Sequence, residues 1–393
     1  MREWTRRLAR IASQVENAFD DQREKLGLSG PRPVRIEAYR GFGRPDRVWV
    51  KARVLKGMPL APSRENDSMW LNLGATLQRF ESDEVPGAKV RVRYPGGEQV
   101  LTADREGYVE AWLEPRPPFA GAEPCQRVEM ELVEPLVAGI DPFRTAAKVL
   151  VPPATARFGV ISDLDDTVVK TDVAARLRMM KNVFFGNAHT RLPFPGVSAF
   201  YRALERGSGP AEHNPVFYVS SSPWNLFDIL NEFLELKQIP AGPLFLRDWG
   251  VASVDPGSGG HSGHKTRHIG TILELYPHLP FILIGDSGQE DPEIYARSVH
   301  DHPERILAVY IRNVSRRPER IAAIRKLAEE VEKSGSTLIL ADDTLAAAKH
   351  AAEQRWIDPA SLAEIGEVAQ AQGKDQPQAG ELKEANQAMS RGQ

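Results

Sequence analysis

The sequence predicts an α/β fold in which a parallel sheet, covered by helices, follows a small all-β sandwich. From residue 158 to residue 354, short apolar runs alternate with helical patterns, which is typical of a parallel sheet with helices on both faces. From residue 34 to about residue 136 the apolar side chains instead recur at every second position, as in antiparallel strands with one buried face. The Pro-rich stretch 150–154 separates the two patterns, and 393 residues suffice for two domains.

The first expected element is an amphipathic helix within residues 1–30. Apolar residues recur there at helical spacing, with basic residues near the start of the pattern and acidic residues near its end. Such a helix either docks its apolar stripe on the protein or lies on a membrane through its basic end, and we favour docking. The stretch 29–33, Ser-Gly-Pro-Arg-Pro, ends the helix.

Residues 31–150 are expected to form the sandwich domain. Turn sequences at 94–97 and 104–107 separate runs of alternating apolar and polar residues, which favours hairpins. This part of the chain contains no cluster of catalytic residue types. We therefore interpret it as an accessory module for binding or positioning.

Residues 155–355 are expected to form the parallel-sheet domain, and residues 369–393 a disordered tail. The tail has almost no large apolar residues, so burial cannot offset the entropy lost on ordering it. The strands of the domain are expected at 158–162, 215–219, 243–247, 281–285 and 306–311. Its helices are expected at 196–206, 223–237, 265–276, 291–299, 316–333 and 342–354.

The composition predicts a soluble protein of a reducing compartment. Hydrophobic residues make up 41% and charged residues 26%, and the net charge of −3 provides no general attraction to nucleic acid. The single cysteine, Cys125, cannot form an internal disulfide. No apolar stretch approaches the roughly 20 residues of a membrane-spanning helix, and the N-terminus lacks the core of a secretory signal. We expect a cytoplasmic protein, free or peripherally bound to a membrane.

The most informative motif is a group of carboxylates after the strand expected at 158–162. Asp163, Asp165 and Asp166 follow this apolar run, where the strand must end. Like charges so close together raise one another's pKa unless a cation neutralises them, and oxygen ligands suit Mg²⁺. The alternative is a solvated acidic turn before a helix capped by Thr167. Asp166 itself we interpret as solvated or as an outer neighbour of the site.

Hydroxyl groups follow the second expected strand. Ser220 and Ser221 come directly after 215–219 and before an expected helix. In an open α/β sheet, ligands bind beyond the carboxyl ends of the strands, and hydroxyl and backbone N–H donors there suit phosphate oxygens. The alternative is a serine that caps a helix with Pro223 at its first position.

A lysine and two more carboxylates follow later in the chain. Lys265 precedes an expected amphipathic helix, where an ammonium group can stabilise charge on a transferring phosphoryl group. The apolar strand at 281–285 delivers Asp286 into a Gly-containing turn, and Asp291 follows about one helical turn later. Each of these residues lies at an expected strand end or helix start, which favours one shared site.

Three histidines occur close together at 261, 264 and 268. They lie in a stretch rich in Gly and Ser that has no thiolate partner. We interpret this stretch as a flexible surface loop in preference to a zinc site.

The motifs resemble those of known phosphohydrolases. The pattern Asp-x-Asp-x-Thr at 163–167, after an apolar strand, resembles the first motif of the haloacid dehalogenase superfamily. It is also similar to the lipin-type motif, but Asp166 replaces a glycine. The four motifs together resemble the phosphatidate phosphatase catalytic domain family first associated with yeast cortical actin patches, over about residues 155–315. The stretches that carry this second resemblance, besides the first motif, are 218–226, 263–265 and 285–291.

The resemblance implies a haloacid-dehalogenase-like Rossmannoid sheet and a Mg²⁺-dependent phosphatidate phosphatase. Such an enzyme converts phosphatidic acid, or a related lipid phosphate at a membrane surface, to diacylglycerol and phosphate. The resemblance implies that Asp163 attacks phosphorus to form an aspartyl-phosphate. Asp165 would protonate the leaving alkoxide and then activate water, while Lys265 would stabilise the phosphoryl charge.

The same resemblance implies the ligands of the metal and of the phosphate. Mg²⁺ would be bound by Asp163, Asp286 and the main-chain carbonyl of Asp165, with Asp291 as a direct or outer ligand. The residues expected to bind phosphate oxygens, or to orient the hydrogen bonds around them, are Ser220, Ser221 and Thr167.

The substrate is open to alternatives. Basic and apolar residues at 176–185, beside the catalytic motif, suit a lipid headgroup, but they are also compatible with a helix core. The same chemistry would serve a phosphoprotein or a soluble phosphomonoester; a polynucleotide end is disfavoured because no basic platform is evident. A non-catalytic membrane or cytoskeletal adaptor is the alternative of a different class, which the intact set of carboxylates argues against. No feature of the sequence specifies an oligomeric state.

Overall fold

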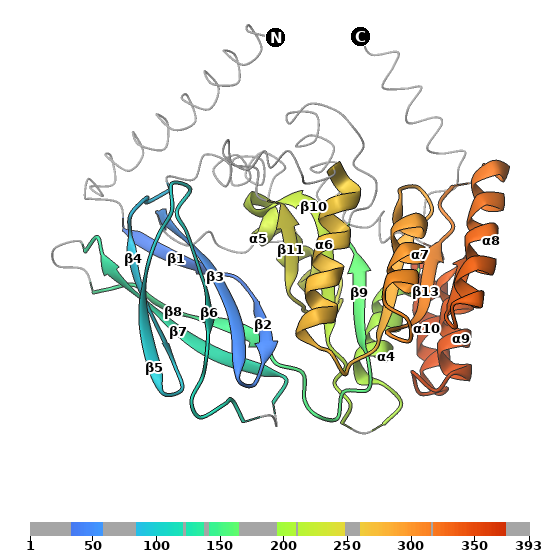
Figure 1. Cartoon of the computed structure of the whole chain (residues 1–393), viewed down its shortest axis with the longest axis horizontal. Helices are drawn as coiled ribbons and strands as arrows, with labels where there is room; N and C mark the ends of the chain where they lie inside the picture. The colour runs from blue at the N-terminus through green and yellow to red at the C-terminus, as the bar shows by residue number, and fades with distance from the viewer. Residues whose placement is uncertain are drawn as a thin grey trace, which may run out of the picture. The chain divides into compact units, whose positions relative to one another are not determined.

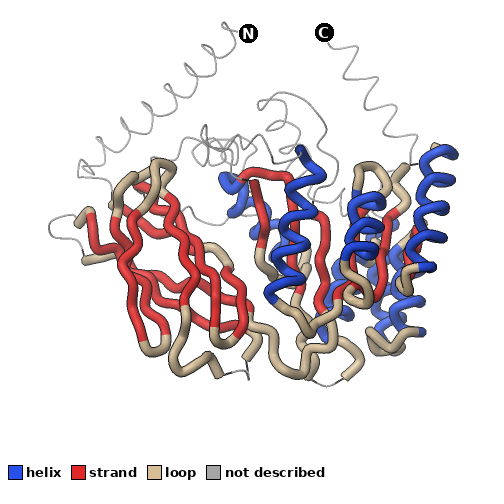
Figure 2. The backbone as a smooth tube through the Cα atoms, viewed as in Figure 1, coloured by secondary structure: helices blue, strands red, loops and turns tan. Residues whose placement is uncertain are grey.

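The protein is a mixed α/β chain with one parallel and one largely antiparallel sheet (Figures 1 and 2). The computed structural model describes residues 33–57, 84–120, 123–136, 141–164, 195–209, 211–247, 260–315 and 317–374. The expected N-terminal helix, the strip at 176–185 and the end of the expected tail from residue 375 lie outside these ranges.

The described residues fall into two compact units. One contains those of Met1–Tyr39, Trp49–Leu113 and Arg127–Lys148. The other contains those of Arg40–Val48, Glu114–Gln126 and Val149–Gln393. The second unit thus includes two short segments from the part of the chain that was expected to form the sandwich. Phe42 illustrates this, since its ring centroid lies 4.8 Å from that of Phe245.

Eight strands form the largely antiparallel sheet. Their order is β1-β3-β2-β8-β7-β4-β5, and β6 pairs with β3. The pairs β1–β3, β4–β5 and β4–β7 are antiparallel, whereas β2 and β8 are parallel. The strands are β1 (Val34–Ala38), β2 (Gly41–Arg44), β3 (Arg47–Lys56), β4 (Lys89–Tyr94), β5 (Gly97–Thr102), β6 (Tyr108–Leu113), β7 (Cys125–Glu134) and β8 (Arg144–Leu150).

The alternating sequence pattern accounts for the buried face of these strands. In β4, Val90 and Val92 are fully buried, while the residues that alternate with them, Lys89, Arg91 and Arg93, are partly exposed. A two-residue turn joins β4 to β5, which confirms the expected hairpin at 94–97. Gly96 in this turn has a φ of 76°, a conformation that glycine adopts at little cost.

Six parallel strands form the second sheet, in the order β11-β10-β9-β12-β13-β14. The strands are β9 (Gly159–Asp163), β10 (Val216–Pro223), β11 (Leu244–Arg247), β12 (Phe281–Asp286), β13 (Ile306–Arg312) and β14 (Thr337–Ala341). The helices are α4 (Val197–Arg206), η1 (Trp224–Leu226), α5 (Phe227–Leu236), α6 (Gly260–Leu275), α7 (Asp291–Asp301), α8 (Pro318–Lys333), α9 (Thr344–Glu353) and α10 (Ser361–Lys374). Helices α6, α7 and α8 pack side by side in one layer, and α4, α9 and α10 contact one another in a second layer (Figure 1).

The strand β9 lies at the centre of this sheet and is apolar on both faces. Val160 and Ile161 have no exposed surface, as expected for a strand covered by helices on both sides. Gly159 lets the neighbouring strand approach closely, since a Cβ atom there would lie 2.3 Å from the ring of Phe281. The centre of the sheet therefore fixes the position of the residue that ends β9, Asp163.

Most expected elements of this sheet are confirmed, with shifted ends, but several differences concern the site. Strand β10 does not end at residue 219; it continues to Pro223. Helix α6 begins at Gly260, so part of the stretch expected to be a loop is helical. Strand β14 and helix α10 were not expected, and α10 includes residues 369–374, which had been assigned to the disordered tail.

Candidate metal and phosphoryl-transfer site

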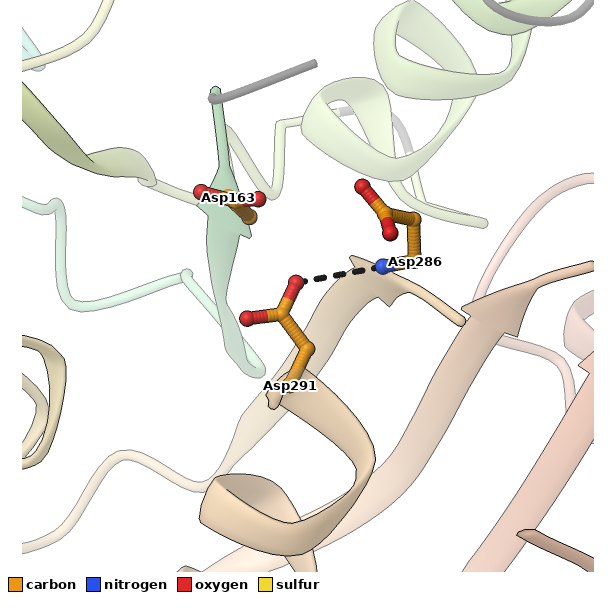
Figure 3. A group of neighbouring side chains, drawn as sticks. All are labelled: Asp163, Asp286 and Asp291. Atoms are coloured by element: carbon orange, nitrogen blue, oxygen red, sulfur yellow. Dashed lines mark hydrogen bonds between the residues drawn. The ribbon is translucent and has the colours of Figure 1, made fainter. Parts of the chain in front are cut away.

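Three carboxylates meet at the carboxyl edge of the parallel sheet. Asp163 ends β9, and Asp286 ends the adjacent strand β12, so the parallel pairing brings both to the same edge. Asp291 is the first residue of α7. One possible ligand atom from each of the three lies within 4.8 Å of those of the other two (Figure 3). This is the only such group of acidic, His or Cys residues among those that the structure describes.

Asp291 is held in place from the backbone of the strand beside it. Its side chain is fully buried, and its Oδ2 accepts a hydrogen bond of 3.1 Å from the backbone N–H of Asp286 (Figure 3). Gly285 makes this approach possible, because a Cβ atom there would lie 2.5 Å from Oδ2 of Asp291. The Gly-Asp sequence at the end of β12 thus has a steric cause.

Lys265 lies between two of the carboxylates. Its Nζ is 2.9 Å from Oδ1 of Asp163 and 2.6 Å from Oδ1 of Asp291, and its side chain is only 3% exposed. A buried ammonium group requires such partners, because leaving water without them is costly. One ammonium group against three carboxylates leaves the cluster with excess negative charge, which favours a further cation.

The turn after β12 is fixed by Asp286 and Ser287. Oδ1 of Asp286 accepts a hydrogen bond of 2.6 Å from the N–H of Gly288. The hydroxyl oxygen of Ser287 accepts hydrogen bonds of 2.9 Å from the N–H groups of Val314 and Ser315, which follow β13. The carboxylate of Asp286 is therefore oriented by its own turn, and that turn is tied to the next strand.

The cluster fits a small divalent cation. Mg²⁺ binds oxygen at about 2.0–2.1 Å, so two ligand atoms on opposite sides of it are roughly 4.2 Å apart. Separations within 4.8 Å among Asp163, Asp286 and Asp291 need little closure to reach this geometry. Both oxygens of Asp291 already contact Lys265 or the Asp286 backbone, which suits an outer role better than direct coordination.

Ser220 lies one position beyond the residue of β10 that pairs with Asp163. Val219 is the Cα partner of Asp163, and Ser220 is fully buried. The Oγ of Ser220 accepts a hydrogen bond of 3.0 Å from the N–H of Ser222. The alternative of a serine cap is wrong, because β10 runs through all three serines and the N-cap of α5, Leu226, makes no side-chain cap. Ser221 is half-buried in the same strand.

The expected loop with three histidines is instead part of α6. His264 is buried, and its Nε2 lies 3.1 Å from the carbonyl oxygen of Ser220. Its ring centroid is 4.4 Å from that of His268 in an edge-on contact. His264 thus ties α6, which carries Lys265, to the strand that carries Ser220.

Two buried tyrosines near the carboxylates were not expected from the sequence. The hydroxyl of Tyr201, on α4, lies 2.7 Å from Oγ of Ser162, and burial raises the pKa of Tyr201 to about 12. Tyr295 donates to the carbonyl of Ile284, and burial together with Asp291 raises its pKa well above the ordinary value. Both tyrosines are therefore neutral and support the site through hydrogen bonds. In the sequence, only the helical spacing between Asp291 and Tyr295 on α7 indicated that one of them lies near the carboxylates.

Three residues of the first motif, Asp165, Asp166 and Thr167, lie outside the described residues. The structure therefore brings together Asp163, Lys265, Asp286 and Asp291, with Ser220 beside them. The roles assigned to Asp165 and Thr167 stay predictions.

Part of the chain is similar to known proteins. Residues 158–313 match the family described as "Phosphatidate phosphatase APP1, catalytic domain". The chain is 34% identical over 152 residues to "Phosphatidate phosphatase APP1" of Saccharomyces cerevisiae. This alignment covers 38% of this chain and 25% of the yeast protein. It is 30% identical over 154 residues to "Uncharacterized protein C29B5.04c" of Schizosaccharomyces pombe, over 38% and 24% of the two chains. The chain thus spans about a quarter of the length of these relatives.

Similarity to solved structures is low. A carbohydrate acetylesterase from Xanthomonas citri, XAC1771, aligns with a TM-score of 0.23 and 11% identity, over 62% of this chain and 58% of that one. Such a likeness supports no statement about fold or function. Among the described helices, none has both the length and the apolar character needed to cross a membrane.

Proposed function

We propose, from the match of residues 158–313 to the phosphatidate phosphatase catalytic domain family, that the protein is a Mg²⁺-dependent phosphatidate phosphatase. It would hydrolyse phosphatidic acid, or a related lipid phosphate, to diacylglycerol and phosphate. The observation that carries this proposal is the meeting of Asp163, Asp286, Asp291 and Lys265 at one sheet edge.

The strand order supports a haloacid-dehalogenase-like fold for this domain. The first strand, β9, is central, the next two lie on one side of it, and the later three lie on the other. The order therefore reverses at β9, and in open α/β sheets ligands bind beyond the carboxyl ends of the strands at such a point. Asp163 ends the strand at this point.

Asp163 is the nucleophile in this proposal. Its carboxylate attacks phosphorus, the bond to the lipid oxygen breaks, and an aspartyl-phosphate forms. Lys265, already 2.9 Å from Asp163, contacts a non-bridging oxygen of the transferring group and offsets its charge. Asp165 protonates the leaving alkoxide and then deprotonates the water that hydrolyses the intermediate.

The divalent ion supplies charge neutralisation at the phosphoryl oxygens when it is bound. Asp163 and Asp286 would hold it through carboxylate oxygens, while Asp291 contacts Lys265 and the Asp286 backbone. Ser220, within β10 and one position beyond the partner of Asp163, contributes to the binding of phosphate.

The test is phosphate release by the purified full chain. Phosphatidate in detergent micelles and a soluble aryl phosphate are each assayed with Mg²⁺ and with chelator. We expect Mg²⁺-dependent release from phosphatidate, and near-total loss in Asp163→Asn with the far-ultraviolet circular dichroism spectrum unchanged. Efficient cleavage of the soluble ester alone would contradict the lipid substrate. Absence of any release from either substrate would favour a non-catalytic adaptor.

A further inference from the structure

The guanidinium group of Arg320, on α8, forms hydrogen bonds with the turn between Asp286 and Asp291. Arg320 lies in the first turn of α8, and its Nε donates a hydrogen bond of 3.0 Å to the carbonyl of Ser287. One of its terminal nitrogens donates to the carbonyl of Gln289. The same guanidinium group contacts both carboxylate oxygens of Glu293, which lies in the first turn of α7.

The residues that Arg320 contacts lie next to Asp286 and Asp291 in the sequence. Ser287 directly follows Asp286, and Gln289 precedes Asp291 by two positions. Through Glu293, Arg320 also contacts the first turn of α7, whose first residue is Asp291. A planar guanidinium group donates in several fixed directions at once, so it can set the path of a short turn in a way that a point charge cannot.

The burial and charge of Arg320 suit a permanent structural cation. Its side chain is 23% exposed, and hydrogen bonds from it to Glu293 raise the pKa of Arg320 above its ordinary value. The ion pair with Glu293 holds the guanidinium group against the first turn of α7.

We propose that Arg320 is a positioning residue for the metal site, because it fixes the turn that aims Asp286 and Asp291 at Asp163. The inference rests on the proposed function, since it takes the three aspartates to hold a divalent cation. Arg320 lies beyond residue 313, where the match to the catalytic domain family ends. The site is then incomplete without α8, whose Arg320 acts through the turn between Asp286 and Asp291.

The test measures binding of Mn²⁺ to the full chain in the absence of substrate, by electron paramagnetic resonance of the free ion. We expect Arg320→Ala to weaken Mn²⁺ binding by about 10- to 100-fold, the usual effect of removing a group that orients metal ligands. The control is Arg325→Ala on the exposed side of the same helix, which should bind Mn²⁺ as the wild type does. In phosphatase assays, Arg320→Ala should raise the Mg²⁺ concentration for half-maximal rate more than the KM for lipid.

A second variant separates geometry from charge and covers the case in which Arg320→Ala does not fold. Arg320→Lys keeps the positive charge but loses the planar guanidinium group and its fixed donor directions, so we expect Mn²⁺ binding to stay weakened. Wild-type affinity in either folded variant would overturn the positioning role alone. A wild type that binds Mn²⁺ but hydrolyses no phosphate ester would contradict only the proposed function, and a wild type that binds no Mn²⁺ would overturn both.

Discussion

The ammonium nitrogen of Lys265 lies 2.9 Å from a carboxylate oxygen of Asp163, and both side chains are only 3% exposed. This contact joins helix α6 to the end of the central strand β9. A buried ion pair contributes little net stability when it is complete. Removing one partner destabilises the fold, because the other charge is left buried without compensation. Replacing either partner should therefore lower both the stability of the sheet edge and the proposed catalytic activity.

The substitution Lys265→Met tests this link. We expect it to destabilise the fold by about 3–5 kcal/mol, because Asp163 and Asp291 lose their shared cation. Phosphate release should fall by about 10²–10³-fold, as for loss of a group that stabilises transition-state charge. Urea denaturation and phosphatase assays measure the two effects.

The matched control is Lys326→Met, an exposed lysine on α8 that should leave both quantities near the wild-type values. Added Mg²⁺ should recover part of the stability of Lys265→Met, since a divalent cation offsets the same carboxylates. An unfolding free energy equal to that of the wild type would contradict the assigned contacts.

The close approach of Asp291 to β12 gives a steric prediction. In Gly285→Ala the new Cβ atom would lie 2.5 Å from Oδ2 of Asp291, so the buried carboxylate must move. We expect a loss of about 1–3 kcal/mol in unfolding free energy, typical of overpacking, together with weaker Mn²⁺ binding.

Gly270 on α6 is the control for this substitution. A Cβ atom at Gly270 meets nothing within 4 Å, and alanine favours a helix over glycine. Gly270→Ala should therefore be stabilising, by up to about 1 kcal/mol. If both glycine variants changed stability in the same direction, the steric role of Gly285 would be refuted.

The polar residues at strand ends were predictable because their signals are local. An apolar run followed, after one small residue, by Asp163 or Asp286 marks both the strand and the residue at its end. The parallel order of the strands then places these ends at one edge. Asp291 could be found in the same way, from its place at the start of a helix. Lys265 was expected to precede a helix, but it lies within α6.

Other parts of the site depend on contacts between distant residues. Strand β10 was expected to end before the serines at 220–222, with a helix cap as one alternative for them, but β10 runs through them and pairs with β11 as far as Pro223. Strand β14 has only three consecutive large aliphatic residues, a run too short to identify a strand by periodicity. Nothing in the helical pattern of α8 distinguishes Arg320 from the other basic residues on it.

A pH-dependent prediction concerns the antiparallel sheet. Glu131 of β7 accepts hydrogen bonds of 2.7 and 2.9 Å from Arg144, and Arg91 and Arg93 lie within ion-pair distance. Hydrogen bonds from Arg144, partly opposed by burial and aided by the other arginines, lower the pKa of Glu131 from 4.5. The stabilisation is therefore present above pH 4.5 and is lost as the pH falls through the lowered value.

Thermal unfolding of Glu131→Gln across pH measures this contribution. At pH 7 the variant should melt below the wild type, and the difference should shrink steadily as the pH falls under about 4.5. Glu129→Gln, at an exposed position of the same strand, is the control and should follow the wild type more closely. A difference that does not depend on pH would show that the carboxylate charge is not its source.

The central claim is that Asp163 and Asp286 share one divalent cation at the carboxyl edge of the parallel sheet. Anomalous diffraction from crystals of the full chain soaked in Mn²⁺ tests it directly. We expect one strong peak in direct contact with carboxylate oxygens of both residues, absent from crystals of Asp286→Asn and present in those of Asp342→Asn, which changes an exposed carboxylate after β14. No peak at saturating Mn²⁺, or a peak that touches neither aspartate, would contradict the account.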